Sequence, residues 1–218
     1  MPTSTDIRAV TTRAVKILRQ SGPGLLARKV VAELFYRRLV VYEAKLDAPR
    51  PTVRSDLPLE FDVLGAERMN DYLDCVPGDG DRFRRRLRLG DRCYAACVGD
   101  EVVAVRWAGF RDVPVTRSGL MLAVGERDAY LNGAYTKQSF RRRRVGAALT
   151  AHLLDDLESE GRRRALSGWI PENRDGRSLN PSRGRPLAVV AVVRIGAWRR
   201  ERRPRPAAAR GRFYRSAP

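Results

Sequence analysis

Cysteine and histidine are scarce in this sequence of 218 residues, which contains three cysteines and one histidine. No Cys-x-x-Cys pair and no cluster of cysteine with histidine occurs, so neither a zinc site nor a disulfide scaffold is predicted. On one strand, Cys93 and Cys97 would lie about 13 Å apart at ~3.3 Å per residue, too far for a disulfide. Unpaired thiols fit a reducing cytoplasm, where we expect the protein to reside.

Long apolar runs are also missing. No segment is long and apolar enough to span a bilayer, and residues 1–6 lack the basic start and apolar core of a signal peptide. The single histidine, His152, stands in a helical pattern, where we interpret it as an ordinary helix-flank residue. No Ser/His/Asp triad can be built on it. We therefore expect a soluble protein without a hydrolase triad.

Lysine is the third scarce residue type, because the 43 basic residues are arginine except at Lys16, Lys29, Lys45 and Lys137. With 25 acidic residues, the formal net charge is +18. Such a charge attracts polyanions, namely nucleic acid, acidic lipid headgroups or phosphorylated cofactors. Codon bias in a GC-rich genome would produce the same arginine excess, and both explanations stay open. The hydrophobic fraction of 43% suits a globular core.

Two helical patterns open the chain, and they predict an N-terminal helical extension over residues 1–47. The first pattern ends at Gly22-Pro23-Gly24, and a second apolar stripe runs from Leu26 to Leu39 beside several basic residues. This segment could contact an acidic membrane surface, or it could pack on the main domain, which we favour. The proline-bearing residues 48–52 mark the domain boundary.

Strand and helix patterns follow one another from residue 53 to 198, which predicts an α/β domain with a mixed sheet flanked by helices. Strands are expected at 58–64, 92–98, 101–110, 120–124, 129–136, 164–170 and 187–195, and helices at 66–75, 82–89 and 141–160. Gly99-Asp100 forms a type II′ hairpin turn in this scheme. Residues 199–218 are rich in Arg, Pro and Ala, so we expect a basic, disordered tail.

The stretch most informative about function is YLNGAYTKQSFRRRRVG, residues 130–146. A strand passes through a short loop into a helix there, and a helix N-terminus offers unpaired N–H groups and a positive dipole end. A phosphate or pyrophosphate group fits such a place. Its charge would be balanced by Arg141, Arg142, Arg143 and Arg144, while Gly146 would allow close approach to the backbone.

This arrangement resembles the GNAT acyltransferase superfamily, in which a strand–loop–helix carries the pattern Arg/Gln-x-x-Gly-x-Gly/Ala and main-chain amides hold the CoA pyrophosphate. The chain fits that pattern in two registers, one led by Arg143 and one led by Arg141. The second register places Phe140 on the family's usual aromatic residue. It also places Arg144 where the family prefers glycine.

Further matches and departures follow downstream. The sequence Trp169-Ile170-Pro171-Glu172-Asn173 resembles the family's next strand and its Pro-Glu-Asn turn, and Ser178 resembles a serine on the following helix. Pro181 interrupts that helix, and the family's Gly-Phe strand entry is absent. These departures, together with Arg144, leave open a GNAT-like domain with degraded activity that acts as an acyl-CoA-binding or interaction module.

The resemblance, over about residues 57–200, implies a mostly antiparallel central sheet flanked by helices and acetyl transfer from acetyl-CoA to an amine. The candidate residues for proton transfer near the cleft are Glu126, Asp128, Tyr130 and Tyr135, of which we select Tyr135 and Asp128. The residues implied in cofactor binding are Thr136, Lys137, Arg141, Arg142, Arg143, Arg144, Val145, Gly146, Asn173 and Ser178. No metal is implied, and the sequence leaves the amine acceptor unassigned. A basic nucleic-acid-binding protein is the remaining alternative, although no helix-turn-helix or aromatic-basic motif supports it.

Overall fold

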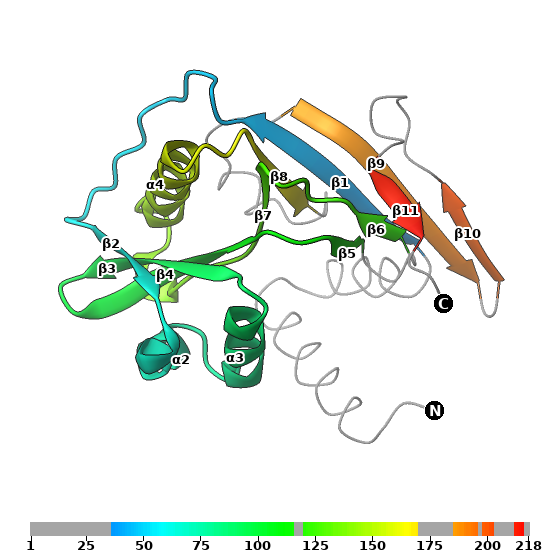
Figure 1. Ribbon diagram of the computed structural model, residues 1–218. Coiled ribbons are helices and arrows are strands. Elements are labelled where there is room, and N and C mark those ends of the chain that lie inside the picture. The colour runs from blue at the N-terminus through cyan, green and yellow to red at the C-terminus, as the bar shows by residue number, and fades with distance from the viewer. Residues whose placement is uncertain (1–35, 116–119, 170–184, 196–197, 203–211, 216–218) are drawn as a thin grey trace. The chain divides into compact units, whose positions relative to one another are not determined.

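The computed structural model describes residues 36–115, 120–169, 185–195, 198–202 and 212–215. The chain divides into two compact units, residues 1–38 with 190–203 and residues 39–189 with 204–218. In the smaller unit, the end of β9 (Arg185–Ile195) pairs antiparallel with β10 (Trp198–Arg202). The larger unit contains the elements that position the candidate site (Figure 1).

A mixed sheet forms the centre of the larger unit, with the strand order β1-β8-β7-β4-β3-β2. The strands are β1 (Tyr36–Lys45), β2 (Glu60–Leu64), β3 (Arg92–Val98), β4 (Glu101–Gly109), β7 (Asp128–Thr136) and β8 (Arg164–Trp169). Neighbouring strands in this order run antiparallel, except that β7 and β8 run parallel. A separate antiparallel sheet has the order β11-β6-β5, with β5 (Val113–Val115), β6 (Leu120–Leu122) and β11 (Phe213–Arg215).

Helices cover both faces of the central sheet (Figure 1). The described helices are η1 (Ala66–Arg68), α2 (Met69–Cys75), α3 (Gly80–Arg88), η2 (Gln138–Phe140) and α4 (Val145–Ser159). Helix α4 lies over one face, and α2 and α3 lie over the other. Successive side chains of β3 serve the two cores alternately: Tyr94 and Ala96 pack on the α4 side, and Cys93 and Cys97 on the other.

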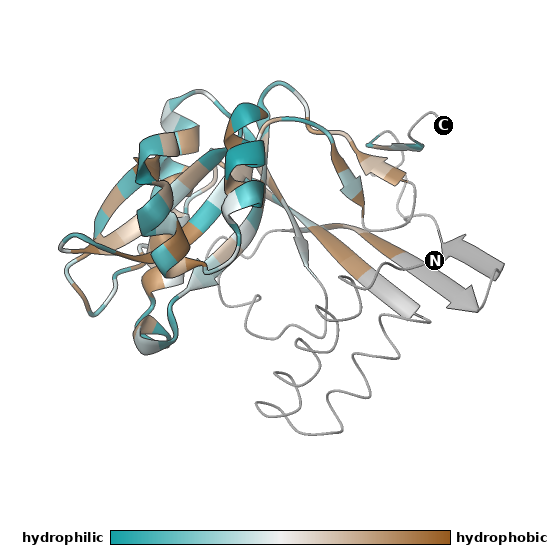
Figure 2. Cartoon of the chain, turned by 90° about the horizontal axis from the view of Figure 1, so that it is seen from below, coloured by the Kyte–Doolittle hydropathy of each residue, from teal (hydrophilic) through white to brown (hydrophobic). Residues whose placement is uncertain are grey.

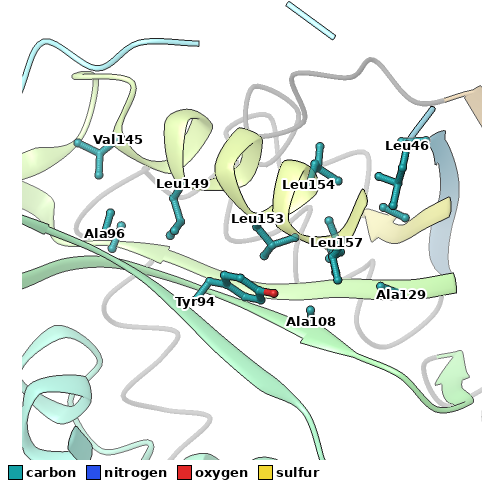
Figure 3. Packing of buried hydrophobic residues seen from close by; sticks show 14 of the residues in the cluster. Leu46, Tyr94, Ala96, Ala108, Ala129, Val145, Leu149, Leu153, Leu154 and Leu157 are labelled. Carbon is teal, nitrogen blue, oxygen red and sulfur yellow. The ribbon is translucent and has the colours of Figure 1, made fainter. Parts of the chain in front are cut away.

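The core on the α4 side depends on a stripe of apolar residues at helical spacing. Val145, Leu149, Leu153 and Leu157 are each at most 1% exposed, and Figure 3 shows them pointing from α4 toward the strands around Tyr94. Residues four apart lie on one face of a helix, so this pattern buries one side of α4 over its full length.

The core on the opposite face contains an aromatic cluster. The ring centroids of Tyr72 and Phe83 lie 4.4 Å apart, and Phe83 and Trp107 lie 5.6 Å apart in an edge-on arrangement. These contacts attach α2 and α3 to β4. All three cysteines are free and buried here, and Cys93 and Cys97 lie on one strand without a disulfide between them, as predicted. In Figure 2, seen from below, hydrophilic residues predominate on the helix surfaces turned toward the viewer, in keeping with the exposed arginines of α3.

The structure confirms the predicted mixed, mostly antiparallel fold, and β3 and α3 agree with the sequence to within two residues at each end. Gly99, in the hairpin turn, has a φ of +58°, as a type II′ turn requires. The long helix was predicted to begin at Arg141, but α4 begins at Val145, because the chain before it passes through left-handed conformations that end a helix.

Two other predictions need correction. The helical stripe was expected to continue to Leu39, but residues from Tyr36 onward form β1, whose pairing with β8 outweighs the local helical spacing. Disorder was expected from 199 to 218, but β10 and β11 form within that segment, because each finds a strand to pair with. Residues 1–35 lie outside the described residues, so the rest of the helical extension and the domain boundaries stay predictions. Within the described ranges, none of the helices has the length and apolar character needed to cross a bilayer.

Replacing Leu153 with alanine tests the packing of α4. Leu153 is fully buried, so Leu153→Ala should lower the free energy of unfolding by about 2–5 kcal/mol through lost burial and a residual cavity. Leu89→Ala is the matched control, because Leu89 is 51% exposed and should cost under about 0.5 kcal/mol. Urea unfolding followed by circular dichroism measures both, and equal losses would contradict the packing described for α4.

Candidate active site

Strands β7 and β8 pair over only part of their length. Their parallel ladder runs from Asp128 opposite Arg164 to Leu131 opposite Ser167. On its other edge, β7 stays paired with β4 as far as Thr136. Residues 132–136 therefore present a backbone edge to which no described residue of β8 is paired. Such an edge offers N–H and C=O groups to an extended ligand.

A bulge interrupts β7 within this unpaired segment. The register with β4 shifts between Val105 and Trp107, where the two residues Gly133 and Ala134 of β7 oppose the single residue Arg106 of β4. Gly133 lies in the bulge with a φ of +59°, and a Cβ there would lie 2.9 Å from Cδ1 of Trp107. Glycine is therefore required by both conformation and space. The bulge directs the end of β7 past Trp107 toward the loop before α4.

Hydrogen bonds hold the loop between β7 and α4 at both ends. The N–H of Lys137 donates to the carbonyl of Val103 over 2.9 Å, and Nε of Arg141 donates to the carbonyl of Thr136 over 3.1 Å. The hydroxyl of Ser55 donates to the carbonyl of Arg143 over 2.8 Å. The loop thus has a defined path from the edge of β7 to the start of the helix.

Two arginines of this loop adopt the left-handed backbone conformation that favours glycine. The φ angles of Arg142 and Arg144 are 65° and 58°, which costs roughly 1–2 kcal/mol for a residue with a Cβ. Arg144 is also the residue that immediately precedes α4. A left-handed residue at this position explains why glycine would be preferred there. In the register led by Arg141, Arg144 occupies the position where the family prefers glycine, so the conformation agrees with that register.

The N-terminus of α4 has the character of an anion site. The first backbone hydrogen bonds of the helix come from the N–H groups of Ala147 and Ala148, both to the carbonyl of Arg144. The N–H groups of Val145 and Gly146 precede them at the positive end of the helix dipole. The side chains of the four arginines 141–144 are exposed around this end. Backbone donors and cations together suit a phosphate or pyrophosphate group.

The remaining predicted cofactor residues differ in their surroundings. Val145 has a buried side chain, so only its backbone faces a ligand. The ammonium group of Lys137 pairs with Glu101 over 2.7 Å and is thereby engaged within the protein. Thr136 ends β7 at the unpaired edge. Asn173 and Ser178 lie outside the described residues.

Asp128, a predicted catalytic residue, is completely buried at the paired end of β7 and β8. Its oxygens accept hydrogen bonds from Nε of Arg164 and Nη1 of Arg212, each over 2.8 Å. Burial alone would raise the pKa of this carboxyl, but the bonds from Arg212 and Arg164 outweigh it, so the pKa lies below its usual value. These contacts favour a structural role for Asp128 over proton transfer.

Tyr135, the other predicted catalytic residue, lies at the unpaired edge. It is partly buried against the α2–α3 core beside Val105, and Cζ of Arg141 lies 5.9 Å from its ring centroid. Its role in proton transfer stays a prediction. The structure therefore brings Tyr135 together with the arginine loop and separates both from Asp128.

Sequence reasoning missed two polar side chains on the α2–α3 side of β7. Arg86 is buried on α3, and Asn132 is the cross-strand partner of Trp107. Arg86 follows buried Phe83 by three residues, so the two lie on one face of α3. That spacing was the available indication that this arginine, unlike its neighbours, points inward.

The family model described as Acetyltransferase (GNAT) family matches residues 59–178. No curated protein matches the chain. Among solved structures, a putative GNAT-family acetyltransferase from Novosphingobium aromaticivorans is similar with a TM-score of 0.51 and 15% identity, over 72% of this chain and 62% of that one. The chain thus spans about three fifths of the length of that structure.

Two other solved structures show weaker similarity. A GCN5-related N-acetyltransferase from Sphaerobacter thermophilus has a TM-score of 0.44 and 14% identity, over 71% of this chain and 50% of that one. AAC(6')-Iy, in complex with the bisubstrate analogue CoA-S-monomethyl-acetylneamine, has a TM-score of 0.44 and 16% identity, over 56% of this chain and 86% of that one.

The ion pairs of Asp128 predict a pH-dependent contribution to stability. Asp128→Asn should lower the free energy of unfolding by roughly 2 kcal/mol at pH 7, because both arginines lose a charged acceptor. Since the folded-state pKa is lowered, the contribution is complete above the ordinary value of 3.8 and disappears as the pH falls through the folded-state value. The difference between wild type and variant should therefore shrink below about pH 4.

Urea unfolding at pH 7, 5 and 3 measures this contribution. Asp81→Asn is the matched control, because the side chain of Asp81 is fully exposed and its pair with Arg84 lies on the surface. A difference for Asp128→Asn that stayed constant from pH 7 to pH 3 would show that the carboxylate charge is not responsible.

Proposed function

The chain belongs to the acetyltransferase (GNAT) family, and we propose that it transfers an acetyl group from acetyl-CoA to the amine of an acceptor. One observation carries this proposal: the unpaired edge of β7 leads directly into the arginine-rich N-terminus of α4. A ligand with an extended polar chain followed by a pyrophosphate fits this arrangement, because the chain would lie along the edge of β7 and the pyrophosphate would lie at the N-terminus of α4. Acetyl-CoA has this composition.

The described residues fit the cofactor in two places. Its pyrophosphate would accept hydrogen bonds from the N–H groups of Val145 and Gly146, and the exposed side chains of Arg141 and Arg143 would balance its charge. Its pantetheine arm would pair with the backbone of residues 132–136. Asn173 and Ser178, implied by the resemblance to contact the CoA arm, remain part of the proposal.

When bound, acetyl-CoA supplies an activated thioester, and the reaction joins the amine nitrogen to the acetyl carbon while the carbon–sulfur bond breaks. A backbone N–H at the edge of β7 would polarise the thioester carbonyl, and the edge would hold the two substrates in reacting positions. The amine must lose a proton, and the departing thiolate must gain one. We assign the second proton transfer to Tyr135, which lies at that edge.

The conformation of the loop Arg141–Arg144 indicates whether the departures from the family pattern would prevent cofactor binding. Arg144 replaces the family's preferred glycine, yet it adopts the conformation that glycine would supply, at the cost of strain. The N–H groups of α4 are consequently presented to a ligand. We therefore propose a working cofactor site, and we expect that any loss of activity arises in positioning the acceptor.

Removing two of the exposed arginines tests the pyrophosphate site. Arg141→Ala with Arg143→Ala should weaken CoA binding by about tenfold or more, because two charged donors are lost. Arg82→Ala with Arg85→Ala removes the same charge from exposed positions on α3, over the other face of the sheet, and should change affinity less than about twofold. Isothermal calorimetry compares the dissociation constants. Equal effects of the two double variants would show that only the net charge of the protein, and not the arginine loop, affects the affinity for CoA.

Acetyl transfer itself is tested by following thiol release from acetyl-CoA with a panel of amines. Turnover that depends on the amine and yields an N-acetylated product, identified by mass spectrometry, is the expected result. Tyr135→Phe should lower kcat more than KM if the phenol protonates the thiolate. CoA binding without release of thiol from any amine would contradict the enzymatic part of the proposal.

A further inference from the structure

On the α2–α3 face of the sheet beside the bulge of β7, two buried polar atoms have no hydrogen-bond partner among the described residues: Nη2 of Arg86 and Oδ1 of Asn132. The side chain of Arg86 is 6% exposed, and its Cζ lies 4.2 Å from the ring centroid of Trp107. Asn132 is the residue opposite Trp107 on β7, so its side chain leaves the sheet on the same face as the indole. An unpaired buried donor and acceptor are unfavourable, so a ligand that pairs with both would bind favourably.

The guanidinium of Arg86 lies against the backbone of the unpaired edge. A Cβ at Gly133 would lie 3.0 Å from Nη1 of Arg86, and Gly133 itself is exposed. Arg86 therefore lies beside the segment of β7 assigned above to the thioester, on the face opposite α4.

The charges around Arg86 leave an excess of one positive charge. Nε of Arg86 donates to Oδ2 of Asp91 over 2.8 Å, and Oδ1 of the same carboxylate pairs with Arg111. One carboxylate thus faces two guanidinium groups, and the side chains of Asp91 and Arg86 are 4% and 6% exposed. A second anion would balance this charge, whereas a polycationic amine would be repelled.

We propose that Arg86 and Asn132 form an acceptor subsite, and that the acceptor is a small amine that also carries a carboxylate, as an amino acid does. The carboxylate accepts hydrogen bonds from the guanidinium of Arg86, and an N–H of the acceptor donates to Oδ1 of Asn132. This inference rests on the proposed acetyl transfer, whose substrate class it names. Arg86 is a substrate-binding residue in this scheme, and it determines the preference for acceptors that carry a carboxylate.

The test compares amino acids with their primary amides, which have the same amine but lack the carboxylate. In the wild-type protein, kcat/KM for thiol release should be at least about tenfold higher for the acids than for the amides, in line with one charged hydrogen bond. Arg86→Met should remove this preference, while the affinity for CoA measured by calorimetry stays unchanged. Arg85→Met, on the same helix but exposed, is the matched control and should keep the preference.

A second variant covers the case in which Arg86→Met does not fold. Asn132→Asp places a carboxylate beside Trp107, where it competes with the substrate for the positive charge, and it should also abolish the preference for acids. Equal turnover of acids, amides and polyamines by the wild type, or a preference that survives both substitutions, would overturn the subsite while leaving acetyl transfer intact.

Binding without turnover separates this inference from the proposed function. Calorimetric titration of the CoA complex with amino acids reports the subsite even if no thiol is released. Binding of acids but not amides, lost in Arg86→Met, would support the subsite although acetyl transfer had failed. Absence of any binding of acids together with absence of turnover would overturn both.

Discussion

The candidate site depends on one asymmetry of strand pairing: β7 is bonded to β4 over most of its length but to β8 only from Asp128 to Leu131. The paired half ties the two sides of the sheet together. The unpaired half is the part of β7 that we propose binds the ligand through its backbone groups. Because β7 stays attached to β4 beyond the point where it leaves β8, the free edge is held rigidly. Backbone groups on such an edge can position a ligand with few contributions from side chains.

Ion pairs stabilise the end at which β7 and β8 are paired. Asp128 and Arg164 are partners in the parallel ladder and also form an ion pair, to which Arg212 contributes from near the C-terminus. This buried carboxylate, which the sequence suggested for proton transfer, instead holds β7 and β8 together where they meet. Removing one partner of a buried pair is costly, because it leaves the others without compensation. Stability and the geometry of the free edge are thus linked through one residue.

The two faces of the sheet divide the proposed chemistry between them. On one face, α4 presents its N-terminus and the exposed arginines 141–144, which suit the phosphates of a cofactor. On the other, α3 places Arg86 against Trp107 and the bulge at Gly133. Both faces are packed with apolar residues, so α3 and α4 are each fixed relative to β7. Two substrates would consequently meet at the strand edge that separates the two cores.

The sequence by itself determined the local elements and the loop of arginines. The stripe from Val145 to Leu157 identified α4, and the run of arginines before it predicted an anion site, because helical spacing and consecutive charges are properties of adjacent residues. Only the tertiary structure decided that residues 36–45 form a strand, that Arg86 is buried, and that Asp128 lies in an ion pair. Each of these depends on a partner distant in the chain, namely β8, Trp107 and Arg212. Local periodicity reports which face of an element is apolar, but it does not report which distant residue that face will meet.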